Sequence, residues 1–149
     1  MAKIRTDFVT NSSSSSFILG FKDKDSINNQ LNQENLPDEY KNRLLRDIKE
    51  HNISKDTALV VFEDEMKFWA KWKAEEKLGY YDFRKLEEHQ EEIDTLASEI
   101  YSRWHEIFSK RIEKYGYLAL VEYDDHEDDE LEWHIVPKLK CKVQRFSHH

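Results

Sequence analysis

A helical periodicity between residues 82 and 115 constrains the fold more than any other feature of this sequence. Apolar residues recur there at intervals of three and four, and the positions between them are charged: Leu86, Ile93, Leu96, Ala97, Ile100, Tyr101, Trp104, Ile107, Phe108, Ile112 and Tyr115. The pattern predicts a helix over 83–115. At 1.5 Å per residue this helix is roughly 50 Å long, longer than a compact domain of 149 residues is wide. It must therefore project or bend, and a homodimer through helix 82–115 would accommodate its length.

Shorter patterns fill the rest of the chain. Apolar or alternating runs predict strands near 15–21, 57–62, 117–124, 131–136 and 138–144. Helical spacing predicts two more main helices, near 37–51 and 64–78, and a short one within 22–35. Strands and helices do not alternate strictly, which favours an α+β class. We therefore expect a single domain over 1–149, with a small antiparallel or mixed sheet of about five strands covered by three main helices.

Composition limits the possible partners. Aromatic residues are 13% of the chain, which argues against disorder despite a charged fraction of 36%. The 23 Lys and Arg against 31 Asp and Glu give a net charge of −8. A negative field opposes binding to phosphate backbones, so nucleic acid is not expected as a partner. Acidic proteins can compete instead for basic surfaces on other proteins, and a protein partner is expected here.

Sites of familiar chemistry are not found in the sequence. The single cysteine, Cys141, excludes an internal disulfide and every zinc motif with two or more cysteines, and its alternation with lysines predicts a small buried side chain. The acidic run 124–130 lacks the EF-hand order and is expected to be a solvated turn. We assign no catalytic residue, metal site or cofactor. No apolar stretch approaches a membrane span or a secretory signal, so the expected location is cytoplasmic, without membrane.

A run of five serines near the start of the chain is the most unusual segment. The candidate binding residues in and around this run are Phe8, Asn11, Ser12, Ser13, Ser14, Ser15, Ser16 and Phe17. Four interpretations are open. In the first, the run forms a strand or tight connection in the protein's own sheet. In the second, it cradles an anion with its hydroxyl and N–H groups, and in the third it is a modification or processing site. In the fourth, it adds as a strand to a partner's sheet, with Phe8 and Phe17 in pockets.

The same segment carries a resemblance. Lys3 and Arg5 precede Phe8-Val9-Thr10-Asn11-Ser12-Ser13-Ser14-Ser15-Ser16-Phe17. This resembles a set of small bacteriophage and bacterial proteins that begin with one or two basic residues followed by Phe-Val-Ser-Asn-Ser-Ser-Ser-Ser-Ser-Phe. Thr10 stands where Ser is more typical and keeps the hydroxyl. The resemblance covers about 15 residues, implies a phage or mobile-element origin, and implies no activity.

Trp69 and Trp72 are the remaining candidate binding residues. With Phe68 they cover more than one face of the expected helix 64–78, so part of this aromatic surface is expected to be exposed. The leading functional prediction is a small acidic phage-like protein that acts as a protein-interaction or modulator module. The alternative is a hydrolase or transferase that uses the Ser12–Ser16 loop as an anion or phosphate site. That alternative requires the serines to converge with His105 or His134 and a carboxylate.

Overall fold

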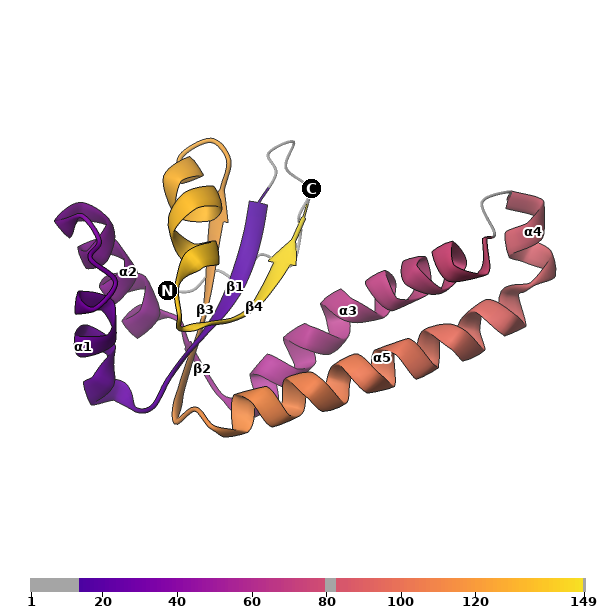
Figure 1. Ribbon diagram of the computed structural model, residues 1–149, viewed down its shortest axis with the longest axis horizontal. Coiled ribbons are helices and arrows are strands. Elements are labelled where there is room, and N and C mark those ends of the chain that lie inside the picture. Colours follow the sequence, from indigo (N-terminus) through magenta and orange to yellow (C-terminus); the bar gives the residue numbers. More distant parts are fainter. Residues whose placement is uncertain (1–13, 80–82, 149) are drawn as a thin grey trace. The chain divides into compact units, whose positions relative to one another are not determined.

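The computed structural model describes residues 14–79 and 83–148. The chain divides into two compact units, each described here by itself (Figure 1). Unit 1 comprises Met1–Ala58 and Ile112–His149, and unit 2 comprises Leu59–Arg111. The expectation of a single domain over 1–149 stays a prediction.

Unit 1 contains an antiparallel sheet of four strands within the described residues. The strands are β1 (Ser14–Phe21), β2 (Asn52–Ile53), β3 (Tyr117–Asp124) and β4 (Lys142–Ser147), in the order β2-β3-β1-β4. The fold is therefore α+β. β1 lies in the interior of the sheet, where Phe17 pairs with Val121 of β3 and with Arg145 of β4. Every residue of β1 is buried.

Two helices cover one face of this sheet, α1 (Ile27–Asn32) and α2 (Asp38–Glu50), as Figure 1 shows. Alternate residues of a strand point to the same face, and here the odd-numbered residues of β1 and β3 point to the helices. The buried core on this face comprises Phe17, Leu19, Phe21, Ala119, Val121 and Tyr123 from the strands and Ile27, Leu31, Leu44 and Ile48 from the helices. Tyr117 also donates a hydrogen bond of 2.7 Å to the carbonyl of Ile48.

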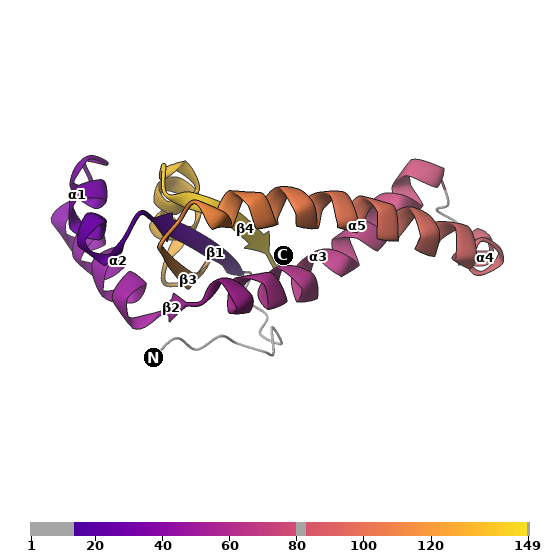
Figure 2. The ribbon, with the colours of Figure 1, turned by 90° about the horizontal axis from the view of Figure 1, so that it is seen from below.

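Helices α3 (Lys55–Leu78), α4 (Phe83–Glu88) and α5 (Gln90–Glu113) supply unit 2. α3 and α5 run side by side (Figure 2). Small side chains at Ala70 and Ala74 of α3 pack in one cluster with Ile93 and Ile100 of α5. Further along, the rings of Phe62 and Phe108 stack with centroids 4.3 Å apart. The pair is therefore held by its own apolar seam.

The predicted strand 57–62 is wrong, because these residues form the start of α3. Ser54 caps this helix: its Oγ accepts a hydrogen bond of 3.0 Å from the N–H of Thr57. Within the run, Phe62 is buried whereas Val60 is 55% exposed. The run is thus amphipathic with a helical period. A favourable cap and continuity with helix 64–78 override the strand propensity of its β-branched residues.

The predicted strand 131–136 is also wrong. Glu130–Ile135 forms a π-helix, and Val136–Lys138 a 3₁₀ turn (gold in Figure 1). The buried residues Leu131 and Val136 lie five positions apart, while Trp133, expected to point inward, is 40% exposed. The chain turns after β3 at Asp124, whose Oδ1 accepts hydrogen bonds from the N–H groups of His126 and Glu127.

The remaining boundaries differ by smaller amounts. The last strand begins at Lys142 rather than at 138, after a register shift beside Leu19, and it lies at the sheet edge as expected. The predicted helix 83–115 is interrupted at His89, between α4 and α5. Helix 37–51 is confirmed as α2, helix 64–78 as the larger part of α3, and the short helix in 22–35 as α1.

Candidate functional site

An exposed stripe on α3 is the main candidate site. It consists of Val60, Asp64, Phe68 and Trp72, spaced four residues apart and therefore on neighbouring turns of one helix face. Phe68 is 66% exposed and Trp72 is 49% exposed. We call these four residues the aromatic stripe. They include three of the five large hydrophobic residues that are exposed in the described part of the chain.

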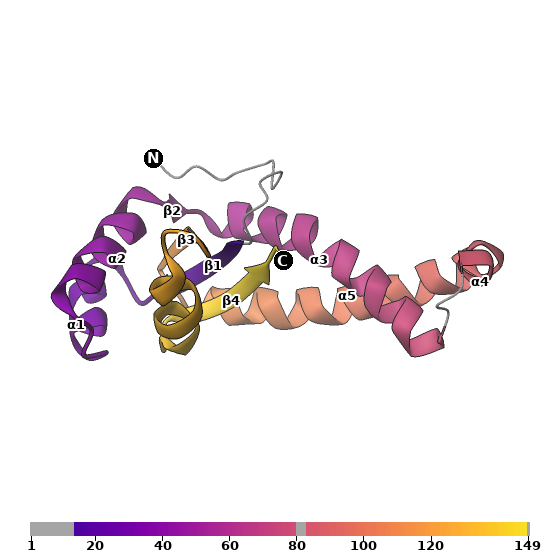
Figure 3. The same cartoon turned by 90° about the horizontal axis from the view of Figure 1, so that it is seen from above.

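Helix geometry explains why this stripe is exposed. Ala70 and Ala74 face the seam with α5. Phe68 and Trp72 each lie two residues from one of these alanines, which is about 200° around the helix axis. The aromatic stripe therefore points away from the seam with α5. Figure 3 shows the ribbon of α3 beside that of α5.

Trp69 fixes the orientation of the two exposed rings. Its ring is half-buried and lies edge-on to Phe68, with centroids 5.4 Å apart, and edge-on to Trp72, with centroids 6.0 Å apart. Edge-to-face pairs of this kind are favourable beyond the area they bury. Within the stripe, Phe68 and Trp72 therefore present pre-ordered aromatic rings, as binding hot spots do. The expectation that some of Phe68, Trp69 and Trp72 are exposed is confirmed.

Unit 2 also carries an acidic groove, separate from the stripe residues. Its volume is about 520 Å³, and it is lined by Leu78 of α3 and by Glu91, Glu92, Thr95, Leu96 and Glu99 of α5. Of the three carboxylates, Glu92 lies 3.5 Å from the imidazole of His89. The groove gives this unit a local negative field in addition to its exposed rings.

The serine run lies in the sheet as far as the structure describes it. Ser14, Ser15 and Ser16 begin β1 and are 3%, 0% and 8% exposed, which confirms the strand interpretation for these three residues. Phe17 is fully buried in the core of unit 1. The other candidate residues, Phe8, Asn11, Ser12 and Ser13, lie outside the described residues, so their binding role stays a prediction.

Ser15 is at the centre of a buried polar cluster that the sequence did not reveal. Its hydroxyl donates a hydrogen bond of 2.8 Å to Glu132 Oε2 and accepts one of 3.0 Å from Arg145 Nη2. The guanidinium of Arg145 lies over the ring of Trp133, 4.6 Å from its centroid. Trp133 in turn donates a hydrogen bond of 2.8 Å to Asp125. The cluster therefore joins β1, β4 and the π-helix.

Burial determines what this cluster can do. Glu132 is 0% exposed. Desolvation, followed by a hydrogen bond with Asp125, raises the pKa of Glu132 to about 7, although the bond from Ser15 opposes the rise. A nucleophile or base must reach its substrate, and both Ser15 and Glu132 are fully covered. We therefore interpret Ser15 and Glu132 as a structural pair, whose hydrogen bond links β1 to the π-helix.

The expected histidine partners lie elsewhere. His134 is exposed on the π-helix. The Nδ1 atom of His105 lies 3.4 Å from the hydroxyl of Ser109 on its own helix. The histidine that does approach the serines is His148, whose Nε2 lies 3.3 Å from Ser16 Oγ. The hydrolase or transferase alternative stays a prediction, because part of Ser12–Ser16 is outside the described residues.

A second buried network lies at the acidic turn. Asp128, expected to be solvated, is only 8% exposed and forms an ion pair with Arg43 of α2. Tyr123 donates a hydrogen bond of 2.8 Å to Asp47, and Arg43 lies over its ring. Burial, together with the charge of Asp47, raises the pKa of Tyr123 well above its ordinary value. This network forms because the fold brings α2 close to β3 and the turn after it. No sequence spacing predicts that proximity.

The remaining chemical tests concern metals, membranes and the thiol. Within residues 14–79 and 83–148, no group of three or more His, Cys, Asp or Glu side chains is placed to hold a metal ion. Among the helices in these ranges, none is both long and apolar enough to cross a membrane. Cys141 is buried as expected, and burial raises the pKa of its thiol to about 12.

Comparisons with protein-family models, curated proteins and solved structures each found no match.

Proposed function

We propose that this protein is a protein-interaction module, and that its aromatic stripe binds a basic amphipathic helix of a partner protein. The observation that carries the proposal is the exposure of Phe68 and Trp72, at 66% and 49% of their surfaces. Large aromatic side chains are enriched among the residues that dominate binding energy. Scattered single hydrophobic residues need no explanation, but Phe68 and Trp72 lie one turn apart on the same helix face, where they are neighbours.

The dimensions of the stripe favour a helical partner. From Val60 to Trp72 it extends over twelve residues, or about 18 Å along the helix axis. A partner helix of similar length would present apolar residues at spacings of three and four to this face. The edge-to-face rings of Phe68, Trp69 and Trp72 are already ordered, which reduces the entropy lost on binding.

Charge favours a basic partner. Residues 59–111 contain thirteen Asp and Glu and nine Lys and Arg, which gives this unit a net charge of −4. The glutamates of the acidic groove belong to the same unit. Charge complementarity of this kind mainly accelerates association and excludes acidic competitors. Binding is therefore expected to weaken as the salt concentration rises.

The test has two steps. Candidate partners are captured on the immobilised protein, and each is then purified and titrated directly against wild type, Phe68→Ala and Trp72→Ala. Each substitution is expected to reduce affinity by about 30-fold or more, the loss associated with a hot spot of 2 kcal/mol. Ile107→Ala is the matched control, because Ile107 is 51% exposed in the same unit but lies on α5, outside the stripe.

Three results would contradict the proposal. The first is a partner whose affinity is the same for wild type and both stripe variants. The second is an equal loss in Ile107→Ala, which would indicate a general effect on the helix pair. The third is self-association of the pure protein that Phe68→Ala abolishes, measured by sedimentation equilibrium. That result would assign the stripe to a homodimer.

A further inference from the structure

Two carboxyl groups meet in the connection between β3 and β4. This connection contains the turn after β3, the π-helix and the 3₁₀ turn, and we call residues 125–138 the π-helix segment. Within it, Glu132 is 0% exposed, and its Oε2 accepts the 2.8 Å hydrogen bond from Ser15 of β1. Glu132 is also hydrogen-bonded to the carboxyl group of Asp125. The segment is thus fastened to the sheet through one member of a carboxyl pair.

The contact between these two carboxyl groups requires a proton. Two ionised carboxylates have no hydrogen to share and repel each other, so one of the pair must be protonated. Asp125 accepts a hydrogen bond of 2.8 Å from Trp133 Nε1, which favours its ionised form. Glu132 is the fully buried member, and desolvation contributes most to raising its pKa to about 7. The proton therefore resides on Glu132 and is shared with Asp125.

The charged groups of neighbouring elements compensate this pair only in part. Arg145 of β4 reaches the hydroxyl of Ser15, and its charge lowers the pKa of Glu132 less than the Ser15 hydrogen bond does. Glu130 and His134, on the π-helix itself, are exposed. Other titratable groups nearby contact different partners: Tyr123 with Asp47, Arg43 with Asp128, and His148 with Ser16. Loss of the shared proton therefore places two negative charges beside one facing cation.

The π-helix segment can open without breaking the sheet. Its backbone N–H groups donate to carbonyls inside residues 124–139: Glu132 to Asp128, Val136 to Leu131, and Leu139 to Val136. The strands β1, β3 and β4 pair with one another outside this segment. A π-helix is a rare form that occurs mostly as a single turn, frequently at functional sites. Its hydrogen bonds can therefore break as a local unit.

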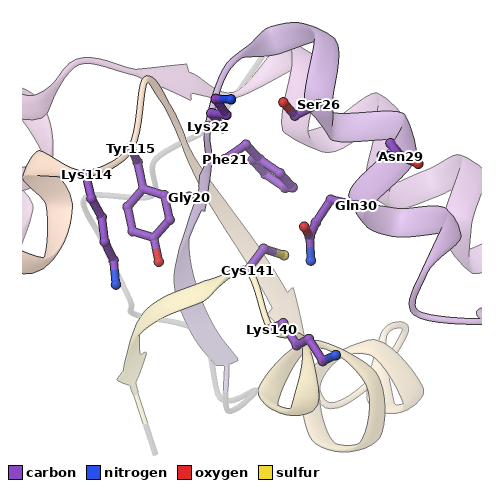
Figure 4. A pocket seen from close by; sticks show the side chains of 10 residues that line it. All are labelled: Gly20, Phe21, Lys22, Ser26, Asn29, Gln30, Lys114, Tyr115, Lys140 and Cys141. Atoms are coloured by element: carbon purple, nitrogen blue, oxygen red, sulfur yellow. The ribbon is translucent and has the colours of Figure 1, made fainter.

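The chain is held firmly where the segment ends. The N–H of Lys140 donates a hydrogen bond of 2.8 Å to Glu34 Oε2, and the carbonyl of Cys141 accepts one of 2.8 Å from the N–H of Gly20. Lys140 and Cys141 are among the residues that line the pocket shown in Figure 4. A movement of the π-helix segment is thus confined to the residues between β3 and this anchored end.

We propose that Asp125 and Glu132 share one proton and form a pH-sensitive latch, which holds the π-helix segment on β1 and releases it locally when the proton leaves to solvent. Release gives the ionised Glu132 access to water. It also uncovers Leu131 and Val136, which are 1% and 0% exposed in the closed form. Their burial opposes release, so the latch changes the population of open molecules by the factor that the proton supplies.

Amide hydrogen exchange of the full chain at pH 6 and pH 8, resolved by NMR and corrected for the intrinsic exchange rate, tests this proposal. The opening constant at the amides of Glu132, Val136 and Leu139 is expected to rise about tenfold, from a Glu132 pKa of about 7 when closed and 4.5 when open. Leu120 reports global unfolding, because its N–H donates to the carbonyl of His51 in the sheet. At both pH values the segment amides are expected to open at least about tenfold more readily than Leu120.

Three variants isolate the shared proton. Glu132→Gln keeps hydrogen-bonding groups in place without the titration, so the rise between pH 6 and pH 8 is expected to disappear. Glu130→Gln is the matched control, because Glu130 is exposed in the same π-helix, and it should keep the full rise. Asp125→Asn removes one charge of the pair, so the midpoint of Glu132 titration, followed by its carboxyl ¹³C shift, should move to lower pH.

Four results would overturn the latch. They are a Glu132 midpoint near 4.5 in wild type, an unchanged midpoint in Asp125→Asn, an equal rise of exchange in Glu132→Gln, and segment amides as protected as Leu120. If Glu132→Gln does not fold, the carboxyl titrations of wild type and Asp125→Asn still decide the question. These measurements do not involve Phe68 or Trp72, so the latch and the aromatic stripe can fail separately.

Discussion

At the scale of single residues, Glu132 shows how burial changes the chemistry of a side chain. On the sequence it alternates with Leu131 and Trp133, a pattern that predicts a solvent-facing residue of a strand. In the fold it is fully buried and bonded to Ser15, and its pKa is raised to about 7, chiefly by desolvation. The folded state therefore retains a proton that the unfolded chain releases near pH 4.5.

The sign of the effect on stability follows from this difference. Between pH 4.5 and pH 7 the folded state binds more protons than the unfolded state, so the free energy of unfolding falls as pH rises. The loss expected from Glu132, with its pKa raised from 4.5 to about 7, is about 3 kcal/mol. In Glu132→Gln this part of the decrease is expected to disappear, and at pH 8 the variant should be more stable than wild type. Urea denaturation at pH 5 and pH 8 measures both effects.

Glu130→Gln provides the comparison for this prediction. Glu130 lies in the same π-helix but is exposed, so its substitution should leave the wild-type pH dependence unchanged. Identical slopes for wild type and Glu132→Gln would show that Glu132 is already ionised in the folded protein at pH 5.

At the scale of elements, α3 shows how a cap outweighs strand propensity. Residues 57–62 contain two valines and a phenylalanine, which favour a strand. Ser54 precedes them, and its hydroxyl oxygen accepts the hydrogen bond of the Thr57 N–H. Helical continuity then places Phe62 inside the unit and leaves Val60 exposed.

Removal of this cap is expected to destabilise the protein. Ser54→Ala should reduce the free energy of unfolding by about 1 kcal/mol, as measured by urea denaturation. Ser54→Asp, which keeps an oxygen acceptor at the same position, should retain most of the stability. If Ser54→Ala and Ser54→Asp are equally stable, the hydrogen bond to Thr57 does not contribute to the helix start.

At the scale of the whole molecule, net charge makes a prediction that is independent of the fold. The chain has a net charge of −8 at pH 7 and an isoelectric point near 5.4. Mutual repulsion between copies disappears as the net charge approaches zero. Solubility is therefore expected to pass through a minimum near pH 5.4 and to rise steeply toward pH 7. A minimum more than one pH unit away, in a measurement of soluble protein against pH, would show that many charged groups titrate abnormally.

Much of the fold was accessible from local patterns. The apolar spacing of three and four located α2, α5 and most of α3, and the run after Tyr117 located β3. The class was correct because strands and helices do not alternate along the chain. For the site, the same spacing indicated that Phe68, Trp69 and Trp72 exceed what one buried face can hold, and the exposure of Phe68 and Trp72 agrees.

Other features depend on residues that are distant in the chain. Ser15 meets Glu132 and Arg145 across more than a hundred residues, and Asp128 meets Arg43 in the same way. Periodicity reports which face of an element is apolar, because that property is local. Which polar groups meet, and therefore which of them lose water and shift their pKa, is set by the packing of the elements against one another.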